Sequence, residues 1–177
     1  NAAPYKHQWH VVEAVAILRR GTGFDVRLRL VGGGHGRALA RLQASILRHD
    51  HVGAFVTQAP FVPHEKIVEE LAQSDVFIFA SSCENLPVTL LEAMATGMPI
   101  ASSNRGPMPE VLGPEAVYFD PENPDSIAQA LKRLICEPQT RERSACDARV
   151  RAEGFTWEDC AAKTWQLLAS VAKRYER

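Results

Sequence analysis

Two glutamates, Glu84 and Glu92, are the residues of this chain best placed to bind a ligand. The apolar run 76–80 predicts a strand that ends shortly before Glu84, and Pro87 marks the first position of the helix that carries Glu92. A strand that leads into a helix through a short turn leaves free backbone N–H groups at the carboxyl edge of a sheet, where anions bind. Carboxylates accept hydrogen bonds from hydroxyl groups. The pair therefore predicts a site for a ligand with phosphate and sugar hydroxyls, although each glutamate alone is also explained as a solvated surface carboxylate.

The composition indicates a single globular domain. The chain has 177 residues, of which 46% are hydrophobic, and this is enough for one sizeable core. Its formal net charge of -1 lacks the basic excess of nucleic-acid-binding domains, so we expect no nucleic-acid partner. No run of about 18 apolar residues occurs, which predicts no transmembrane segment.

The spacing of cysteines and histidines argues against a metal site. Cys83, Cys136, Cys146 and Cys160 include no C-x-x-C pair and are predicted to be reduced thiols of a cytoplasmic protein. The histidines form no H-E-x-x-H motif, and the segment His49 to His51 is interpreted as a solvated loop. We therefore expect neither a disulfide framework nor bound metal.

Apolar periodicity predicts that strands and helices alternate along the chain. Strands are expected at 25–31, 51–56, 76–80, 99–102 and 116–119. Helices are expected at 8–20, around 39–46 and 67–71, and at 87–95, 126–135, 140–153 and 157–175, with Ser126 and Thr156 as N-caps. This alternation predicts the α/β class, with a Rossmann-like, doubly wound parallel sheet that binds its ligand at the carboxyl edge of the strands.

A glycine loop, Gly32 to Gly36, lies between the first predicted strand and the next helix. Glycine lets the backbone approach a ligand closely, so Gly33 and Gly34 are candidate binding residues. The loop does not match the dinucleotide fingerprint, because Arg37 stands where G-x-G-x-x-G requires glycine. A plain tight turn explains the loop equally well, and a dinucleotide-dependent dehydrogenase domain is disfavoured.

The E-x7-E spacing of Glu84 and Glu92, followed by A-M-A-x-G-x-P at 93–99, resembles the donor-site signature of group 1 retaining glycosyltransferases of the GT-B fold. The loop 104–110 and the phrase F-T-W-E that contains Trp157 resemble the same family, in which this tryptophan would serve packing. The resemblance runs through almost the whole chain and matches the C-terminal half of a GT-B enzyme. It implies that residues 3–177 form the donor-binding domain and that the N-terminal acceptor domain is missing. Separately, because the chain does not begin with methionine, residues 1–2 are interpreted as the remnant of a tag.

The resemblance also implies roles for residues around the two glutamates. Glu84, the catalytic candidate, would bind hydroxyls of the donor sugar near the reacting carbon, and Glu92 would accept hydrogen bonds from the ribose. Lys6 and the free N–H groups of Val88 and Thr89 would hold the diphosphate and neutralise the leaving charge.

Further donor contacts follow from the same resemblance. The glycine loop would lie beside the donor, and Val62 and His64 would border the nucleotide base. Asn85 and Leu86 occupy the turn where the family often has glycine and phenylalanine. The arginine that usually stands five residues before the lysine would fall at Asn1, so it is either absent or cut away.

The function implied is transfer of a sugar from a nucleotide-diphosphate donor, with UDP or GDP as the nucleotide, to an acceptor hydroxyl with retention of configuration. The pathway expected is synthesis of a polysaccharide, lipopolysaccharide or glycoconjugate, in the cytoplasm or peripherally at the inner face of a membrane. A carbohydrate or lipid-linked acceptor would bind through the missing domain, so the isolated fragment is expected to be inactive. No metal or other cofactor is expected, because the helix end and Lys6 replace it. Alternatives are a nucleotide-sugar epimerase or phosphorylase of related fold, and a non-catalytic regulatory nucleotide-binding module.

One structural consequence concerns the centre of the sheet. In the family, the first strand precedes the position of Lys6 and is central in the sheet. If this strand is missing, we expect an open apolar slot, which a second copy of the chain would fill.

Overall fold

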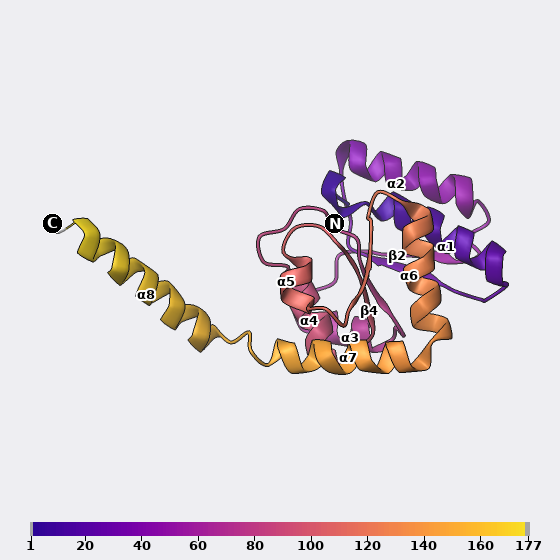
Figure 1. Cartoon of the computed structure of the whole chain (residues 1–177). Helices are drawn as coiled ribbons and strands as arrows, with labels where there is room; N and C mark the ends of the chain where they lie inside the picture. Colours follow the sequence, from indigo (N-terminus) through magenta and orange to yellow (C-terminus); the bar gives the residue numbers. More distant parts are fainter. Residues whose placement is uncertain (1, 176–177) are drawn as a thin grey trace.

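The computed structural model describes residues 2–175, in which short strands alternate with helices (Figure 1). Asn1, the position of the expected arginine, lies outside the described residues. The strands are β1 (Leu28–Val31), β2 (Val56–Ala59), β3 (Phe77–Phe79), β4 (Ile100–Ser103) and β5 (Val117–Phe119). The helices are η1 (Pro4–Lys6), α1 (Gln8–Thr22), α2 (Gly36–His49), η2 (His64–Lys66), α3 (Ile67–Ala72), α4 (Val88–Thr96), α5 (Met108–Leu112), α6 (Pro124–Cys136), α7 (Pro138–Ala152) and α8 (Trp157–Tyr175), of which η1 and η2 are 3-10 helices.

All described strand pairs are parallel, as predicted, but they form two sheets instead of one. β1 pairs with β2, so that Leu28 lies opposite Val56, and the second sheet has the order β3-β4-β5. Parallel neighbours need crossover connections, and the helices between the strands supply them. The predicted α/β class is confirmed.

Helices cover both faces of the sheets and divide the interior into two apolar cores. The first core joins α1, α2 and α6 to β1 and β2 through residues such as Val12, Leu30 and Leu134. The second core lies among α3, α4, α5 and α7, with Met94 and Leu112 at its centre. The strand β4 contributes residues to both cores and is buried along its whole length. This arrangement corresponds to the predicted doubly wound organisation.

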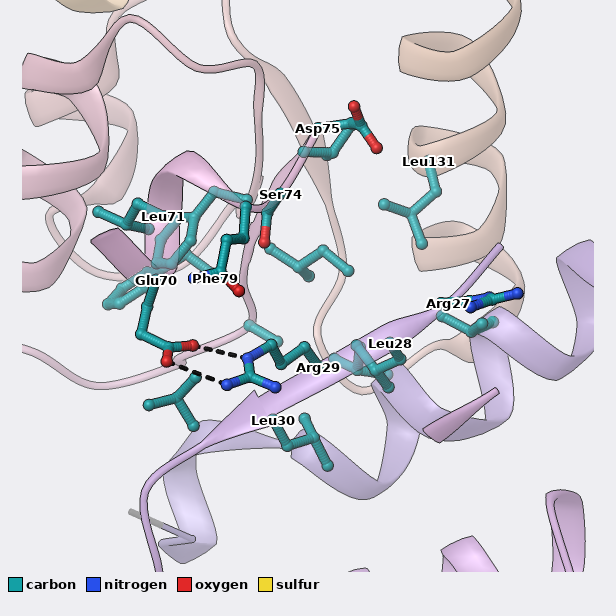
Figure 2. A pocket seen from close by; sticks show the side chains of 18 of the residues that line it. Arg27, Leu28, Arg29, Leu30, Glu70, Leu71, Ser74, Asp75, Phe79 and Leu131 are labelled. Carbon is teal, nitrogen blue, oxygen red and sulfur yellow. Dashed lines mark hydrogen bonds and ion pairs between the residues drawn. The ribbon is translucent and has the colours of Figure 1, made fainter. Parts of the chain in front are cut away.

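A slot with a volume of about 1300 Å³ lies between the two sheets. Its walls include consecutive residues of β1 and of β3, which point to opposite faces of each strand, so the strand edges border the slot. Leu131 of α6 closes it on one side and Leu71 of α3 on the other, as Figure 2 shows. The apolar slot that we expected is therefore present.

An ion pair lies at the side of this slot and ties α3 to β1. Arg29 Nε is 2.6 Å from Glu70 Oε2, and Arg29 Nη2 is 3.0 Å from Glu70 Oε1, so the guanidinium donates both bonds to one carboxylate (Figure 2). A bidentate pair fixes geometry as well as charge. The Glu70 contact therefore sets where α3 sits over the strand edge.

The strand predicted at 51–56 is wrong, because β2 begins only at Val56. Asp50, expected in a solvated loop, is 5% exposed, and its carboxylate accepts the backbone N–H groups of Ala54, Phe55 and Val56. These three bonds fold the segment before β2 into a turn. A side chain that competes for backbone donors in this way removes them from a strand ladder.

The ends of the other elements also differ in part from the prediction. β1 starts three residues later than expected, because Arg19 bonds to both Asp25 and the Val26 carbonyl and holds them outside the strand. The cap of α6 is Asn123, whose side chain accepts from the N–H of Ser126, so the assignment of Ser126 as the cap is wrong.

The C-terminal helix α8 extends away from the other elements (Figure 1). Thr156 caps it as predicted, because its Oγ1 accepts the Asp159 N–H at 3.1 Å. Trp157, expected to serve packing, is 86% exposed, so that expectation is wrong for this chain.

Candidate donor site

The start of α4 is built by an unusual turn at Pro87. Pro87 has φ -80° and ψ 80°, close to an inverse γ-turn, and the Val88 N–H accordingly donates to the Leu86 carbonyl at 3.0 Å. The expectation that Val88 presents a free N–H is therefore wrong. The ring of Pro87 restricts its φ to this region, which favours the turn. Among the first donors of α4, Thr89 is the one left to a ligand, since the N–H groups of Leu90 and Leu91 donate to the Pro87 carbonyl.

A cavity of about 310 Å³ lies beside this turn. It is lined by Phe61, Val62, His64, Ile67, Val88, Thr89 and Glu92. Five of these residues, from the loop before α3 and from α4, were predicted to contact a donor, and the fold brings them together. The apolar rings and methyl groups of Phe61, Val62 and Ile67 leave Glu92 as the acidic group of the cavity.

Glu92 lies partly buried on α4 and contacts a histidine across the cavity. Its Oε1 is 3.3 Å from His64 Nδ1, and the side chain of Glu92 is 21% exposed whereas that of His64 is 79% exposed. The carboxylate is thus not the freely solvated helix residue that its position alone would allow. Because His64 is largely exposed, a ligand that displaced its ring would donate a hydrogen bond to Glu92 Oε1 in its place.

Glu84 lies on the loop between β3 and α4. One of its carboxylate oxygens, Oε1, is buried and has no hydrogen-bond partner among the described residues. A buried acceptor that is left unpaired costs free energy comparable to its desolvation, and a ligand donor would remove that cost. The position therefore fits a residue whose partner is a bound molecule.

Lys6 lies at the end of η1, directly before α1, as predicted. Lys6 and Thr89 both line the slot between the sheets, so the predicted phosphate-binding groups open to one space. Two backbone and side-chain bonds hold the turn that carries Lys6: the Ser82 N–H donates to the Tyr5 carbonyl at 2.8 Å, and Ser82 Oγ lies 2.8 Å from His7 Nε2. His7 and Ser82 were not identified from the sequence, because no motif marks them.

Glu84 and four further candidates lie outside the walls of both cavities. The Gly33 carbonyl accepts the Ala2 N–H at 2.7 Å, and Gly34 forms a parallel bridge with Ala2, so these glycines contact the beginning of the chain. Ala2, interpreted as part of a tag remnant, is only 7% exposed and belongs to the first core. Asn85 and Leu86 are exposed on the turn before Pro87.

The described residues offer no group of three or more His, Cys, Asp or Glu side chains that could hold a metal ion. Within residues 2–175, no helix has the length and apolar character that crossing a membrane requires. The four cysteines are free and exposed.

Comparison with known proteins shows which family the chain resembles in sequence. Residues 1–151 match the family model described as Glycosyl transferases group 1. The chain is 33% identical over 170 residues to an MMP alpha-(1->4)-mannosyltransferase of Mycolicibacterium hassiacum, covering 91% of this chain and 39% of that protein. It is 30% identical over 167 residues to a GDP-mannose-dependent alpha-(1-6)-phosphatidylinositol dimannoside mannosyltransferase of Mycobacterium tuberculosis, covering 94% and 42%.

Solved structures share the fold. Sucrose-phosphate synthase from Thermosynechococcus elongatus superposes with a TM-score of 0.81 at 23% identity, over 97% of this chain and 44% of that one. HepE from Anabaena, in complex with UDP and glucose, gives 0.81 at 20% identity, over 95% and 46%. The chain thus spans about two fifths of the length of the curated relatives that it matches.

Proposed function

Because the chain belongs to the group 1 family of glycosyl transferases, we propose that the full-length protein transfers a sugar from a nucleotide-diphosphate sugar to an acceptor hydroxyl, and that this chain binds the donor. The observation that carries the proposal is the cavity at the start of α4. It unites Val62, His64, Thr89 and Glu92, all of which the sequence predicted to be donor contacts.

The chemistry of the lining suggests how the donor lies. The apolar wall of Val62 and Ile67 suits the face of a nucleotide base, and Glu92 is placed to accept hydrogen bonds from ribose hydroxyls. Thr89 N–H and the Lys6 ammonium would contact the diphosphate. They would stabilise the negative charge that grows on the leaving nucleotide as the sugar departs, which is where an electrostatic contribution lowers the barrier.

Glu84 is proposed to act on the sugar itself. Its unpaired, buried Oε1 would accept a hydrogen bond from a hydroxyl of the transferred sugar. This bond would hold the anomeric carbon near the hydroxyl of the acceptor substrate. We propose retention of configuration as the stereochemical outcome, in the synthesis of a polysaccharide, lipopolysaccharide or other glycoconjugate. The acceptor, a carbohydrate or a lipid-linked one, would bind a part of the full-length protein outside this chain.

The relatives favour mannose as the transferred sugar. Both curated relatives described above are named as mannosyltransferases, and one of them is named as GDP-mannose-dependent. We therefore propose GDP-mannose as the donor, bound without a metal ion.

A regulatory nucleotide-binding module without activity is the alternative from another class. A module of that kind needs Glu92 but gains nothing from a buried, unpaired Glu84. A nucleotide-sugar epimerase of related fold is a further alternative, and it would convert the free donor without any acceptor.

Sugar transfer by the full-length protein tests the proposal. Labelled GDP-mannose, with UDP-glucose for comparison, is incubated with the protein and an extract of the source cells, and the labelled product is analysed for anomeric configuration. We expect incorporation with retention, and we expect Glu84→Gln to lower the rate by about 100-fold or more, the loss typical of removing a transition-state contact. Glu69→Ala, on the exposed side of α3, is the matched control and should leave the rate unchanged. Full activity of Glu84→Gln would remove this residue from the mechanism, and release of free epimerised donor would favour the epimerase.

A further inference from the structure

His7 has a backbone conformation that marks it as a special position. It is the only non-glycine residue among residues 2–175 with a positive φ, which is 45° with ψ 27°. An L-amino acid in this left-handed region costs about 1 kcal/mol or more, so the surroundings must hold it there. The residue lies between η1 and α1 and is only 7% exposed.

Its surroundings hold it through both the backbone and the ring. The His7 carbonyl accepts the His10 N–H at 2.9 Å and so begins α1. The imidazole stacks on His10 with centroids 5.6 Å apart and meets the edge of Trp9 at 5.8 Å. Because the ring is packed on these neighbours, Nε2 has one direction in which to bond, toward Ser82.

The surroundings of His7 favour one tautomer of its ring. Ser82 Oγ–H donates to the Tyr5 carbonyl at 3.3 Å, which leaves Oγ to accept a hydrogen bond from His7 Nε2–H, with 2.8 Å between Oγ and Nε2. His7 Nδ1 is buried without a partner, which is tolerable for a bare acceptor nitrogen and costly for an N–H donor. Both observations favour the neutral ring with its proton on Nε2.

Ser82 therefore contacts the residues on both sides of Lys6. Its backbone N–H and its Oγ–H donate to Tyr5, and its Oγ accepts from His7. Ser82 is also two residues before Glu84, on the same loop. The lysine turn and the glutamate loop are thus joined at a single serine, and His7 supplies one of the bonds.

We propose that His7 is a positioning residue that holds Lys6 and Glu84 in fixed relation to one another, through Ser82, so that both contact the same bound nucleotide sugar. This inference rests on the proposed function, in which these two residues bind the donor. His7 itself does not touch the donor. A histidine that only filled the core would stabilise the fold without affecting affinity.

Three variants separate these two roles. His7→Gly keeps the left-handed backbone and removes the bond to Ser82, and Ser82→Ala removes the same bond from the other side. His7→Asn restores a side-chain donor on a residue type that tolerates positive φ. His51→Gly, in an exposed turn, is the control for the loss of a histidine.

The first readout is the affinity of the chain for GDP, UDP and ADP, measured by calorimetry with the nucleotide that the unaltered chain binds best. We expect His7→Gly and Ser82→Ala each to weaken binding by about tenfold, the double variant to weaken it no further than one of them, and His7→Asn to regain part of the loss. The melting temperature of His7→Gly should fall, since the packing of the buried ring is lost together with the bond, so the affinities are compared at a temperature where every variant is folded. Unchanged affinity in both single variants would overturn the proposal.

The second readout needs no ligand and separates this proposal from the proposed function. The amide of Ser82, bonded to Tyr5, should exchange its hydrogen about tenfold faster or more in His7→Gly than in the unaltered chain or in His51→Gly. If the unaltered chain binds none of the three nucleotides, the donor role fails, and exchange alone decides whether His7 holds the loop. An exchange rate that His7→Gly leaves unchanged would overturn the positioning role whatever the binding result.

Discussion

At the scale of single residues, two polar atoms near the candidate site are buried without a hydrogen-bond partner among the described residues. Glu84 Oε1 and His7 Nδ1 are both of this kind. They call for different explanations, because a carboxylate oxygen gains from a ligand donor, whereas the imidazole nitrogen is kept bare by its tautomer. Glu84 thus belongs to the proposed contacts with the sugar and His7 to the support of the loop.

The pH dependence of stability tests the state of His7. Burial lowers the pKa of His7 below its ordinary value of 6.5, and nearby His10 and Arg41 lower it further, while Glu122 and Asp120 act in the opposite direction. As the pH falls, the His7 imidazole of the unfolded chain therefore takes up a proton near pH 6.5, whereas that of the folded chain takes it up only at a lower pH. The free energy of unfolding should fall as the pH falls through this range toward the folded pKa.

Urea unfolding at about pH 7.5 and about pH 5.5 measures this effect, with His7→Asn as the reference. The unaltered chain should lose more stability between these two values than the variant, since the variant has no imidazole at this position. An equal loss in both proteins would show that His7 is protonated in the folded state as readily as in the unfolded one.

Sequence patterns identified only part of the site at this scale. Glu84 and Glu92 belong to a motif with fixed spacing, whereas Lys6 was assigned from its place before the first helix. The structure places Glu92 in the cavity with Val62 and His64. His7 and Ser82 were missed because their importance lies in a backbone angle and a contact 75 residues apart in the chain, which no local pattern encodes. The prediction of a free N–H at Val88 was wrong because, in the γ-turn at Pro87, this N–H donates to the Leu86 carbonyl.

At the scale of elements, Asp50 determines where β2 begins. Its carboxylate accepts three backbone N–H groups, and the resulting turn moves the strand past the position that apolar periodicity predicted. Burial raises the pKa of the Asp50 carboxyl, but the hydrogen bonds from Phe55, Val56 and Ala54 outweigh this and leave the pKa below its ordinary value. The Asp50 carboxylate is therefore charged in the folded chain, and both of its oxygens accept hydrogen bonds.

We expect Asp50→Ala to destabilise the fold by about 3 kcal/mol, because it leaves buried donors without partners. Asp50→Asn keeps one acceptor oxygen and loses the charge, so its cost should lie between those of the alanine variant and the unaltered chain. The midpoint of urea unfolding measures both. A loss below about 1 kcal/mol for Asp50→Ala would mean that water satisfies the three N–H groups.

The helices were predicted more accurately than the strands. Long periodic segments such as α1 and α6 differ from the prediction by only a few residues at their ends, since their apolar faces extend over several turns. Strands of three or four residues give a weaker pattern, and side chains such as Arg19 and Asp50 decide their ends through contacts that the sequence does not announce.

At the scale of the whole molecule, the open slot leaves one edge of β1 without a neighbouring strand among the described residues. The Leu28 and Gly32 N–H groups donate to the carbonyls of Phe55, just before β2, and Ala59, at its end. The alternate residues Arg29 and Val31 therefore direct their backbone groups to the other side, into the slot. A parallel bridge pairs Ala2 with Gly34, which follows β1 in the sequence. In this register, each residue of a strand ahead of Ala2 would pair with the residue 32 positions later in the chain. Residues placed ahead of the chain would therefore run along β1 in register.

An extension of Ile-Val-Ile-Val-Gly ahead of Asn1 should fill the slot, because about five residues span roughly the 16 Å length of such an edge. We expect slower amide exchange at Arg29 and Val31 and a higher melting temperature. A control extension in which each valine is replaced by proline cannot complete the ladder and should give neither effect.

A second copy of the chain is the competing occupant. Light scattering that shows a dimer of the unextended chain, converted to a monomer by the apolar extension, would assign the slot to the second copy. Equal exchange at Arg29 and Val31 with both extensions would show that the slot does not accept a strand ahead of Asn1.

Helix α8 should contribute little to the stability of this chain. Trp165 and Leu168 are exposed, and the helix extends away from the two cores (Figure 1). Removal of residues 155–177 should therefore change the melting temperature by less than about 2 °C. A fall of more than about 5 °C would reveal packing of α8 on the remaining elements in solution.

Calorimetric titration of the chain with GDP, UDP and ADP, in the presence of EDTA, tests the central claim most directly. We predict binding of GDP without metal, weakened in Glu92→Ala by about 1–3 kcal/mol because ribose hydroxyls lose their acceptor, and unchanged in the control Glu69→Ala. Binding of none of the three nucleotides, or equal affinity of Glu92→Ala and the unaltered chain, would contradict the donor site at the start of α4.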